Sequence, residues 1–184
     1  MSGRSGRKSR AHRTDIRRID WLHSRYNFDA WAGCQGRLIV APLWVAYREN
    51  LGTLMRTCDA AGACLAVPDT PHYRLALDKG DTLHMLRPCV HWVEPSKEAW
   101  LAAQRDKGWR IYAVELDQYA VSLEHLPKAT ERTVLLLGNE GAGILNHIIA
   151  DADLCVQIPM YGAGRSLNVA VAGSLVLYKL AGLT

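Results

Sequence analysis

Long apolar runs are missing from this chain of 184 residues. A helix needs about 20 consecutive apolar residues to span a bilayer, and Arg, Lys, Glu, Asn or Gly interrupts every hydrophobic stretch before that length. The residues after Met1 also lack the apolar core of a secretory signal peptide. These absences argue against a membrane protein, and we expect a cytoplasmic protein with no membrane partner.

Paired cysteines and regularly spaced histidines are also missing. The five cysteines are odd in number and form no Cys-x-x-Cys pair, so neither a disulfide framework nor a four-ligand zinc site is indicated. The seven histidines are scattered without a His-x-x-x-His pair, and we therefore expect no metal. Cys58, Cys64 and Cys155 are expected to be small buried hydrophobic side chains.

Positive charge is concentrated at the amino end. Residues 1–18 carry a net charge of +6 and the whole chain +4, so the remaining residues sum to −2. Such a hydrophilic segment is expected to be a flexible arm that binds RNA phosphates. A solvated tail and an organelle transit peptide are the alternatives. The basic side chains of this arm are Arg4, Arg7, Lys8, Arg10, Arg13, Arg17 and Arg18.

Short apolar runs alternate with amphipathic segments along most of the chain. After a predicted helix at 14–31, strands are expected at 37–45, 63–68, 91–95, 109–116, 134–137 and 154–159. Helices are expected at 49–62, 75–85, 96–108, 144–152 and 167–180. This alternation predicts an α/β fold with a mainly parallel sheet and helices on both faces. We expect a basic arm (1–18), a helical extension (19–35) and one domain (36–184).

Three loops with unusual chemistry are expected at the carboxyl ends of strands, where open α/β sheets bind ligands. They are Tyr47–Asn50, Gly138–Gly143 and Met160–Asn168. The glycine loop GNEGAG lacks the Gly-Lys-Ser/Thr ending of a P-loop and is not Gly-x-Gly-x-x-Gly, which argues against a dinucleotide oxidoreductase. Its Glu140 is expected to have a partner, and a solvated turn is the alternative.

Each loop also has a purely structural interpretation. Asn50 and Ser166 are both well placed to cap the helices that follow them. The three glycines of the second loop fit a tight turn with positive φ. The last helix has a face of small residues and is apolar almost all round, which predicts close packing beneath other chain or in an oligomer interface.

Taken together, three segments resemble the motifs of the SPOUT class, specifically the SpoU-type RNA 2'-O-ribose methyltransferases. The first, ENLGTLMRTCDAAG, is similar to the family's Asn-x-Gly-x-x-x-Arg helix start. The second and third are LLLGNEGAGI and IPMYGAGRSLNVAVAGSLVLY. They occur in the family's order over about residues 37–181. The lead-in to the first motif departs from the common Asp-Pro-x-Asn, because Arg48 and Glu49 stand there.

The resemblance implies a homodimer that binds S-adenosylmethionine (AdoMet) in the loops of a C-terminal deep trefoil knot. It implies catalytic roles for Asn50, Arg56, Glu140, Ser166 and Asn168. It implies AdoMet contacts for Val114, Gly138, Ile158 and Leu167. Arg165 occupies a position at which family members vary, and no catalytic role is assigned to it.

The implied reaction is methyl transfer from AdoMet to a ribose 2'-hydroxyl of structured RNA. Stand-alone family members mostly act on tRNA, which is the expected substrate. Ribosomal RNA, including a resistance-type methylation, and a non-catalytic knotted RNA-binding module are the alternatives. Because guanidinium stays protonated at a pKa above about 12, we expect Arg56 to stabilise a developing alkoxide and grip a phosphate, not to act as a base.

Overall fold

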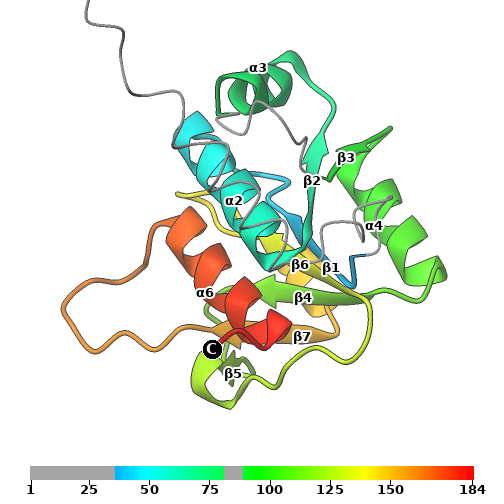
Figure 1. The fold of residues 1–184 in the computed structure, drawn as a ribbon. Helices are drawn as coiled ribbons and strands as arrows, with labels where there is room; N and C mark the ends of the chain where they lie inside the picture. The colour runs from blue at the N-terminus through cyan, green and yellow to red at the C-terminus, as the bar shows by residue number, and fades with distance from the viewer. Residues whose placement is uncertain (1–35, 81–88) are drawn as a thin grey trace, which may run out of the picture. The chain divides into compact units, whose positions relative to one another are not determined.

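The computed structural model describes residues 36–80 and 89–184, shown in colour in Figure 1. The predicted helix at 14–31, the basic side chains of residues 1–18 and the end of the predicted helix at 75–85 lie outside the described residues. In the described ranges, no helix is both long enough and apolar enough to cross a bilayer.

The described strands form one parallel sheet with the order β3-β2-β1-β6-β4-β7-β5. All pairings in this sheet are parallel, which confirms the predicted α/β class. The strands are β1 (Leu38–Ala41), β2 (Cys64–Pro68), β3 (Val90–Val93), β4 (Arg110–Val114), β5 (Val121–Ser122), β6 (Thr133–Leu137) and β7 (Leu154–Gln157).

Helices cover both faces of the sheet. One face packs against α2 (Arg48–Ala61), α3 (Pro71–Gly80) and α6 (Val169–Ala181), and Figure 1 shows α2 and α6 side by side. The other face packs against α4 (Lys97–Asp106) and α5 (Asn146–Ala150). A short 3-10 turn, η3 (Leu123–His125), follows β5.

The central strand β6 shows how the two cores are built. Side chains alternate across a strand, so Leu135 and Leu137 enter the core beneath α2 and α6, whereas Val134 and Leu136 enter the opposite core. All four are at most 1% exposed. Burying each such side chain stabilises the fold by roughly 1.5–3 kcal/mol. The continuous apolar run of β6 is therefore typical of a strand buried on both faces.

Small residues let α6 lie very close to the sheet, as the sequence predicted. A Cβ atom on Gly173 would come within 2.5 Å of a Leu137 methyl and 3.0 Å of a Leu54 methyl. Beside it, the hydroxyls of Ser174 and Thr57 are 3.0 Å apart and join α6 to α2. The outer side of α6 is not covered within the described chain, where Val171 and Leu175 are 48% and 42% exposed, so of the two predicted settings the oligomer interface stays a prediction.

Several predicted element ends are confirmed. Helix α2 stops at Gly62, which has φ 67, and Ser96 caps α4 by accepting a hydrogen bond from the Ala99 amide at 3.1 Å. Strand β1 is shorter than predicted, because Pro42 has no N–H to extend the ladder. Strand β5 was not predicted, since two residues are too short to show a period.

Two structural interpretations were wrong, and a third was right only in part. Asn50 is the third residue of α2 and does not cap it; the N-cap position is held by Tyr47, without a side-chain hydrogen bond. Helix α6 is capped by Asn168 instead of Ser166. Of the three glycines in the second loop, Gly143 alone has a positive φ, of 67.

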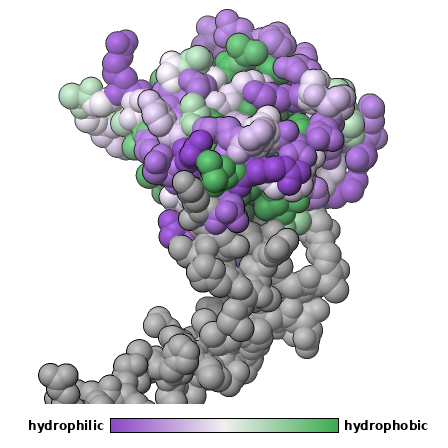
Figure 2. All heavy atoms as spheres, turned by 90° about the horizontal axis from the view of Figure 1, so that it is seen from above, coloured by the Kyte–Doolittle hydropathy of each residue, from purple (hydrophilic) through white to green (hydrophobic). Residues whose placement is uncertain are grey.

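The surface seen in Figure 2 is mainly polar, with apolar side chains scattered singly or in small groups. Such scattered apolar residues are normal on the surface of a globular domain.

Candidate functional site

A cavity of about 530 Å³ opens at the carboxyl ends of β4, β6 and β7. Its walls come from four segments: the start of α2, the end of β4, the glycine loop after β6, and the chain from β7 to α6. This volume lies in the range of roughly 300–1,000 Å³ that small-molecule sites occupy. The topology therefore brings all three loops singled out in the sequence to one hollow.

Nearly all residues singled out in the sequence line this cavity. Four of the five residues with implied catalytic roles do so: Asn50, Glu140, Ser166 and Asn168. All four residues with implied AdoMet contacts do so as well: Val114, Gly138, Ile158 and Leu167. Arg56 is the exception and does not line it.

The carboxylate of Glu140 ties the glycine loop to the start of α2. Its Oε1 accepts hydrogen bonds from Asn50 Nδ2 at 2.8 Å and from the Tyr47 amide at 3.1 Å. Its Oε2 accepts one from the Ala46 amide at 3.0 Å. Glu140 thus takes the place of a helix cap, because it accepts hydrogen bonds from the backbone amides of Ala46 and Tyr47, which lie just before the first residue of α2.

These contacts also set the charge state of Glu140. Burial by itself raises the pKa of this carboxyl, but hydrogen bonds from Ala46, Asn50 and Tyr47 outweigh it and leave the pKa below its ordinary value. Glu140 is therefore an anion at neutral pH. It serves as a fixed acceptor and not as a proton donor.

Asn50 extends the contact to the third loop. Its Oδ1 accepts a hydrogen bond from Asn168 Nδ2 at 2.9 Å, while Asn168 Oδ1 accepts from the Ala170 amide at 2.9 Å and caps α6. Asn50 is only 7% exposed, so its amide has few other partners. One chain of hydrogen bonds, Glu140–Asn50–Asn168, thereby joins residues far apart in the sequence.

The loop between β1 and α2 is held by two side chains that the sequence did not single out. Tyr73 of α3 donates its hydroxyl to the Val45 carbonyl at 2.8 Å, and the Leu43 carbonyl lies at 3.2 Å. Asn139 Nδ2 donates to the Trp44 carbonyl at 3.1 Å. Burial, with the Glu140 charge, raises the pKa of Tyr73 to about 12, so the phenol stays a donor.

The glycine loop closes on itself. Asn139 and Gly143 exchange two backbone hydrogen bonds of 2.9 Å, and Asn139 Oδ1 accepts from the Gly141 and Ala142 amides. A Cβ on Gly138 would lie 2.5 Å from the Gly143 backbone, so only glycine fits there. Glu115, at the end of β4, accepts from the Ile144 amide at 3.1 Å and lines the cavity.

Arg56 stands apart from this network. It lies six residues after Asn50 on α2, a rise of about 9 Å along the helix axis. Its side chain is exposed and makes no hydrogen bond or ion pair with the described residues. A cation in this setting is available to a phosphate or a second protein chain.

The third loop, between β7 and α6, forms the open wall of the cavity. Figure 1 shows this segment extending away from the sheet before it returns to α6. Met160 and Leu167 are each 37% exposed and Tyr161 is 89% exposed. Tyr161 donates its hydroxyl to Glu124 at 2.7 Å, and Ser166 makes no hydrogen bond with the described residues. Ser166 therefore faces the cavity without a structural partner.

The chain matches a known family over most of its length. The model of the SpoU rRNA Methylase family matches residues 37–178. The chain therefore belongs to the SpoU family, whose members are AdoMet-dependent RNA ribose 2'-O-methyltransferases.

Individual relatives act on different RNAs. A tRNA (guanosine(18)-2'-O)-methyltransferase of Aquifex aeolicus is 32% identical over 150 residues, which cover 79% of this chain and 69% of that protein. The Bacillus subtilis 23S rRNA (guanosine(2553)-2'-O)-methyltransferase RlmP is 35% identical over 139 residues. That match covers 72% of this chain but 53% of RlmP. For the mouse tRNA methyltransferase TARBP1, 32% identical, the match covers 78% of this chain and 9% of that protein. The chain thus spans about half or less of the length of these last two relatives.

Solved structures agree with this assignment. The A. aeolicus TrmH/SpoU tRNA modifying enzyme superposes with a TM-score of 0.66 and 28% identity, over 80% of this chain and 75% of that one. An AdoMet-bound rRNA methyltransferase from Sinorhizobium meliloti superposes with a TM-score of 0.66 and 26% identity. That match covers 79% of this chain and 56% of the other one.

Proposed function

We propose that this chain transfers the methyl group of AdoMet to a ribose 2'-hydroxyl of a structured RNA. The observation that carries the proposal is the hydrogen-bonded chain Glu140–Asn50–Asn168 at the cavity. It joins one residue from each of the three family motifs at the carboxyl edge of the sheet.

The cavity suits AdoMet in size and in the chemistry of its lining. It combines apolar side chains with backbone groups at the ends of strands, and the glycine loop contributes Gly138, Gly141 and Gly143 to its lining. We assign cofactor contacts to Val114, Gly138, Ile158 and Leu167. The bound cofactor supplies an electrophilic methyl group, and the protein contributes alignment and electrostatics.

The residues of the protein act on the ribose 2'-hydroxyl that attacks the methyl group. Because Arg56 does not line the cavity of its own chain, we assign it to the cavity of the second chain in the proposed homodimer. There it stabilises the alkoxide that develops on the ribose oxygen and grips a neighbouring phosphate through its planar fork of donors. Asn50, Glu140 and Asn168 position the start of α2, and Ser166 contacts the substrate from the open wall. The proton of the hydroxyl leaves for solvent.

The proposed substrate is tRNA. Several relatives of about 30% identity are tRNA (guanosine(18)-2'-O)-methyltransferases, which supports this choice. RlmP, at 35% identity, makes ribosomal RNA the second candidate. A non-catalytic RNA-binding module is disfavoured, because Asn50, Arg56, Glu140, Ser166 and Asn168 are all present.

The wider organisation follows the family. We propose a C-terminal trefoil knot within a SPOUT domain at 36–184, and a homodimer that covers the exposed apolar side of α6. The exposed side chains Val171 and Leu175 support that interface. The basic arm at 1–18, followed by the extension at 19–35, would add non-specific and salt-dependent affinity for RNA in the cytoplasm.

The test is incubation of the purified full chain with methyl-labelled AdoMet and, in parallel, total tRNA and ribosomal RNA. Label recovered in a 2'-O-methylnucleoside of tRNA, and absent with Arg56→Ala, supports the proposal. Label in ribosomal RNA alone would overturn the choice of substrate. AdoMet binding without label in either RNA would favour the binding module.

A further inference from the structure

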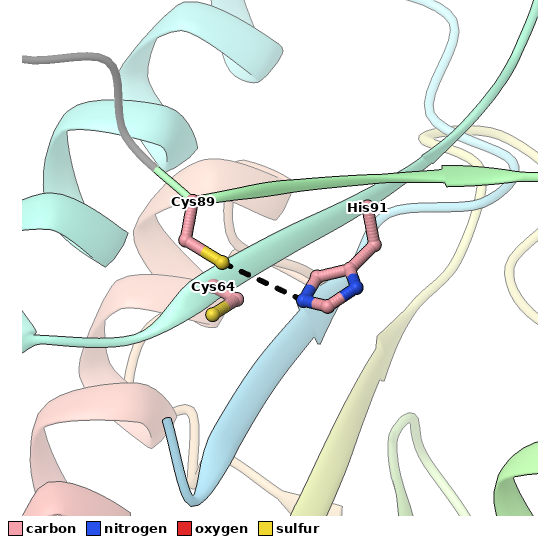
Figure 3. A group of neighbouring side chains, drawn as sticks. All are labelled: Cys64, Cys89 and His91. Atoms are coloured by element: carbon pink, nitrogen blue, oxygen red, sulfur yellow. Dashed lines mark hydrogen bonds between the residues drawn. The ribbon is translucent and has the colours of Figure 1, made fainter. Parts of the chain in front are cut away.

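A second cluster of reactive side chains lies at the opposite edge of the sheet. Figure 3 shows the Cys89 thiol and the His91 ring turned toward each other, with the Cys64 side chain beside them. Cys64 is the first residue of β2, and Cys89 and His91 flank the first residue of β3. These are the amino ends of parallel strands, so the cluster is remote from the cavity at the carboxyl ends.

Strand register brings these three residues together. Leu65 pairs with Val90 and Ala66 with His91, which places Cys64 beside Cys89 on neighbouring strands. The Leu65 amide donates to the Cys89 carbonyl at 2.8 Å and fixes this register. Because side chains alternate along a strand, Cys89 and His91 share the face on which Cys64 lies. That face packs against α4 and is partly buried.

The distances approach those of a zinc site. The possible ligand atoms of the three residues lie within 4.8 Å of one another, and Cys89 Sγ is 3.5 Å from His91 Nε2. Zinc bonds of about 2.3 Å to sulfur and 2.0–2.1 Å to nitrogen, at tetrahedral angles, require a sulfur–nitrogen separation of about 3.5 Å. They require a sulfur–sulfur separation of about 3.8 Å. The pair of Cys89 and His91 therefore already has the required spacing, and the Cys64 sulfur needs to approach the other two ligand atoms by at most about 1.3 Å.

We propose that Cys64, Cys89 and His91 bind one Zn²⁺ ion, which cross-links the edge strand β3 to β2. Two thiolates and an imidazole are ligands that select zinc over magnesium or calcium. On binding, the two thiols release their protons to solvent, two sulfur–zinc bonds and one nitrogen–zinc bond form, and no electron is transferred. A water molecule completes the fourth position.

The position of the cluster indicates a structural role. Strand β3 lies at the edge of the sheet and pairs with β2 alone among the described strands. A metal bridge at the amino end of β3 would hold this edge strand in register with β2, its one neighbour among the described strands. Loss of the metal is therefore expected to lower stability and to leave the AdoMet cavity intact.

The sequence analysis missed this cluster because its spacing is not that of a familiar zinc motif. The side chains of Cys89 and His91 point to the same side only when the segment that holds them is a strand. The third member comes from a different strand, 25 residues earlier in the chain.

The test is a titration of the reduced, chelator-treated full chain with Co²⁺ as a spectroscopic probe, followed by Zn²⁺. We expect one Co²⁺ per chain, thiolate-to-cobalt charge-transfer absorption, and displacement of that absorption by Zn²⁺. Cys64→Ser and Cys89→Ser should each abolish the charge-transfer band, whereas the matched control Cys155→Ser should keep it. Absence of the band in the unmodified chain, or its survival in both variants, would overturn the proposal.

A second measurement does not depend on the folding of a variant. Thiol alkylation of the unmodified chain, mapped by peptide mass, should slow at least about tenfold at Cys64 and Cys89 when Zn²⁺ is added. The alkylation rates of Cys58 and Cys155 should not change. Zinc should also raise the melting temperature by several degrees. Equal alkylation of Cys64 and Cys89 with and without Zn²⁺ would contradict the site.

Discussion

The two walls of the cavity are built differently. The wall formed by the start of α2 and the glycine loop is fixed by Glu140, which accepts three hydrogen bonds, and by Asn50, which is 7% exposed. The wall formed by the chain between β7 and α6 is exposed, with Tyr161 at 89%. Asn168 is the residue of the exposed wall that is bonded to the fixed one.

This difference separates residues that hold the site in shape from residues that are free to contact a ligand. Residues of the fixed wall are held by the fold itself, so replacing them should change both stability and activity. Residues of the exposed wall have few partners within the described chain, so replacing them should change activity alone. Arg56 belongs to α2 but is exposed, and it should behave like a residue of the exposed wall.

The largest effect is expected for Arg56→Lys. This change keeps the positive charge but loses the planar fork of donors, and we expect methyl transfer to fall by about 100-fold or more. The melting temperature should stay unchanged, because Arg56 makes no hydrogen bond with the described residues. Turnover on RNA and thermal unfolding measure the two effects. Arg48→Lys, on the same helix, is the control, and comparable losses in both variants would refute the role of Arg56.

Asn50→Ala should affect stability and activity together. It removes the Nδ2 donor to the Glu140 anion and leaves Asn168 without its acceptor, which should cost about 2 kcal/mol of unfolding free energy. Denaturant unfolding measures this loss, and we expect methyl transfer to fall by about tenfold or more.

Ser166→Ala is the matched variant on the exposed wall. Its unfolding free energy should stay within about 0.5 kcal/mol of the unmodified chain while methyl transfer falls. If Ser166→Ala destabilised the protein as much as Asn50→Ala, the distinction between the two walls would be wrong.

A smaller effect is expected for Tyr73→Phe. The change removes the hydroxyl that donates to the Val45 carbonyl, and should lower the unfolding free energy by about 1 kcal/mol. Because that loop presents the Ala46 and Tyr47 amides to Glu140, KM for AdoMet should rise with little change in kcat. Tyr112→Phe is the control, since the Tyr112 hydroxyl makes no hydrogen bond with the described residues. Equal effects of both variants would exclude a positioning role for Tyr73.

Acid should remove the contribution of Glu140. Its pKa is lowered in the folded chain, so its stabilising effect is fully present above the ordinary value of 4.5 and is lost as pH falls through the folded pKa. The melting temperature of the unmodified chain should therefore exceed that of Glu140→Gln at pH 7, and the difference should shrink below pH 4.5. Melting curves of both proteins between pH 7 and acid pH measure this difference. A difference in melting temperature that grew as the pH fell would contradict a lowered pKa for Glu140.

The fold was more predictable than the local roles. Buried strands and capped helices carry signals within a few residues, and β6, α2 and α4 were predicted for that reason. The position of Asn50 inside α2 was not predicted, because an Asn that caps a helix and an Asn that bonds to Glu140 look alike in sequence. The same holds for Tyr73, whose contact with residues 43–45 depends on how α3 packs.

The functional site, too, could be predicted from the sequence only in part. The motif residues could be found by resemblance, and the sheet brings most of them to one cavity. Arg56 was found by the same resemblance, but the structure places it on α2, exposed and outside the cavity. The cluster of Cys64, Cys89 and His91 was missed, because it arises from the pairing of β2 with β3.

The most direct test of the central claim is the chemical position of the transferred methyl group. RNA treated with the full chain and AdoMet is subjected to alkaline hydrolysis, which requires a free 2'-hydroxyl beside each phosphodiester bond. Methylation of a ribose predicts an alkali-stable dinucleotide that carries the methyl group and does not form with Arg56→Ala. A methyl group found on a base, with every phosphodiester bond still cleaved by alkali, would contradict the account.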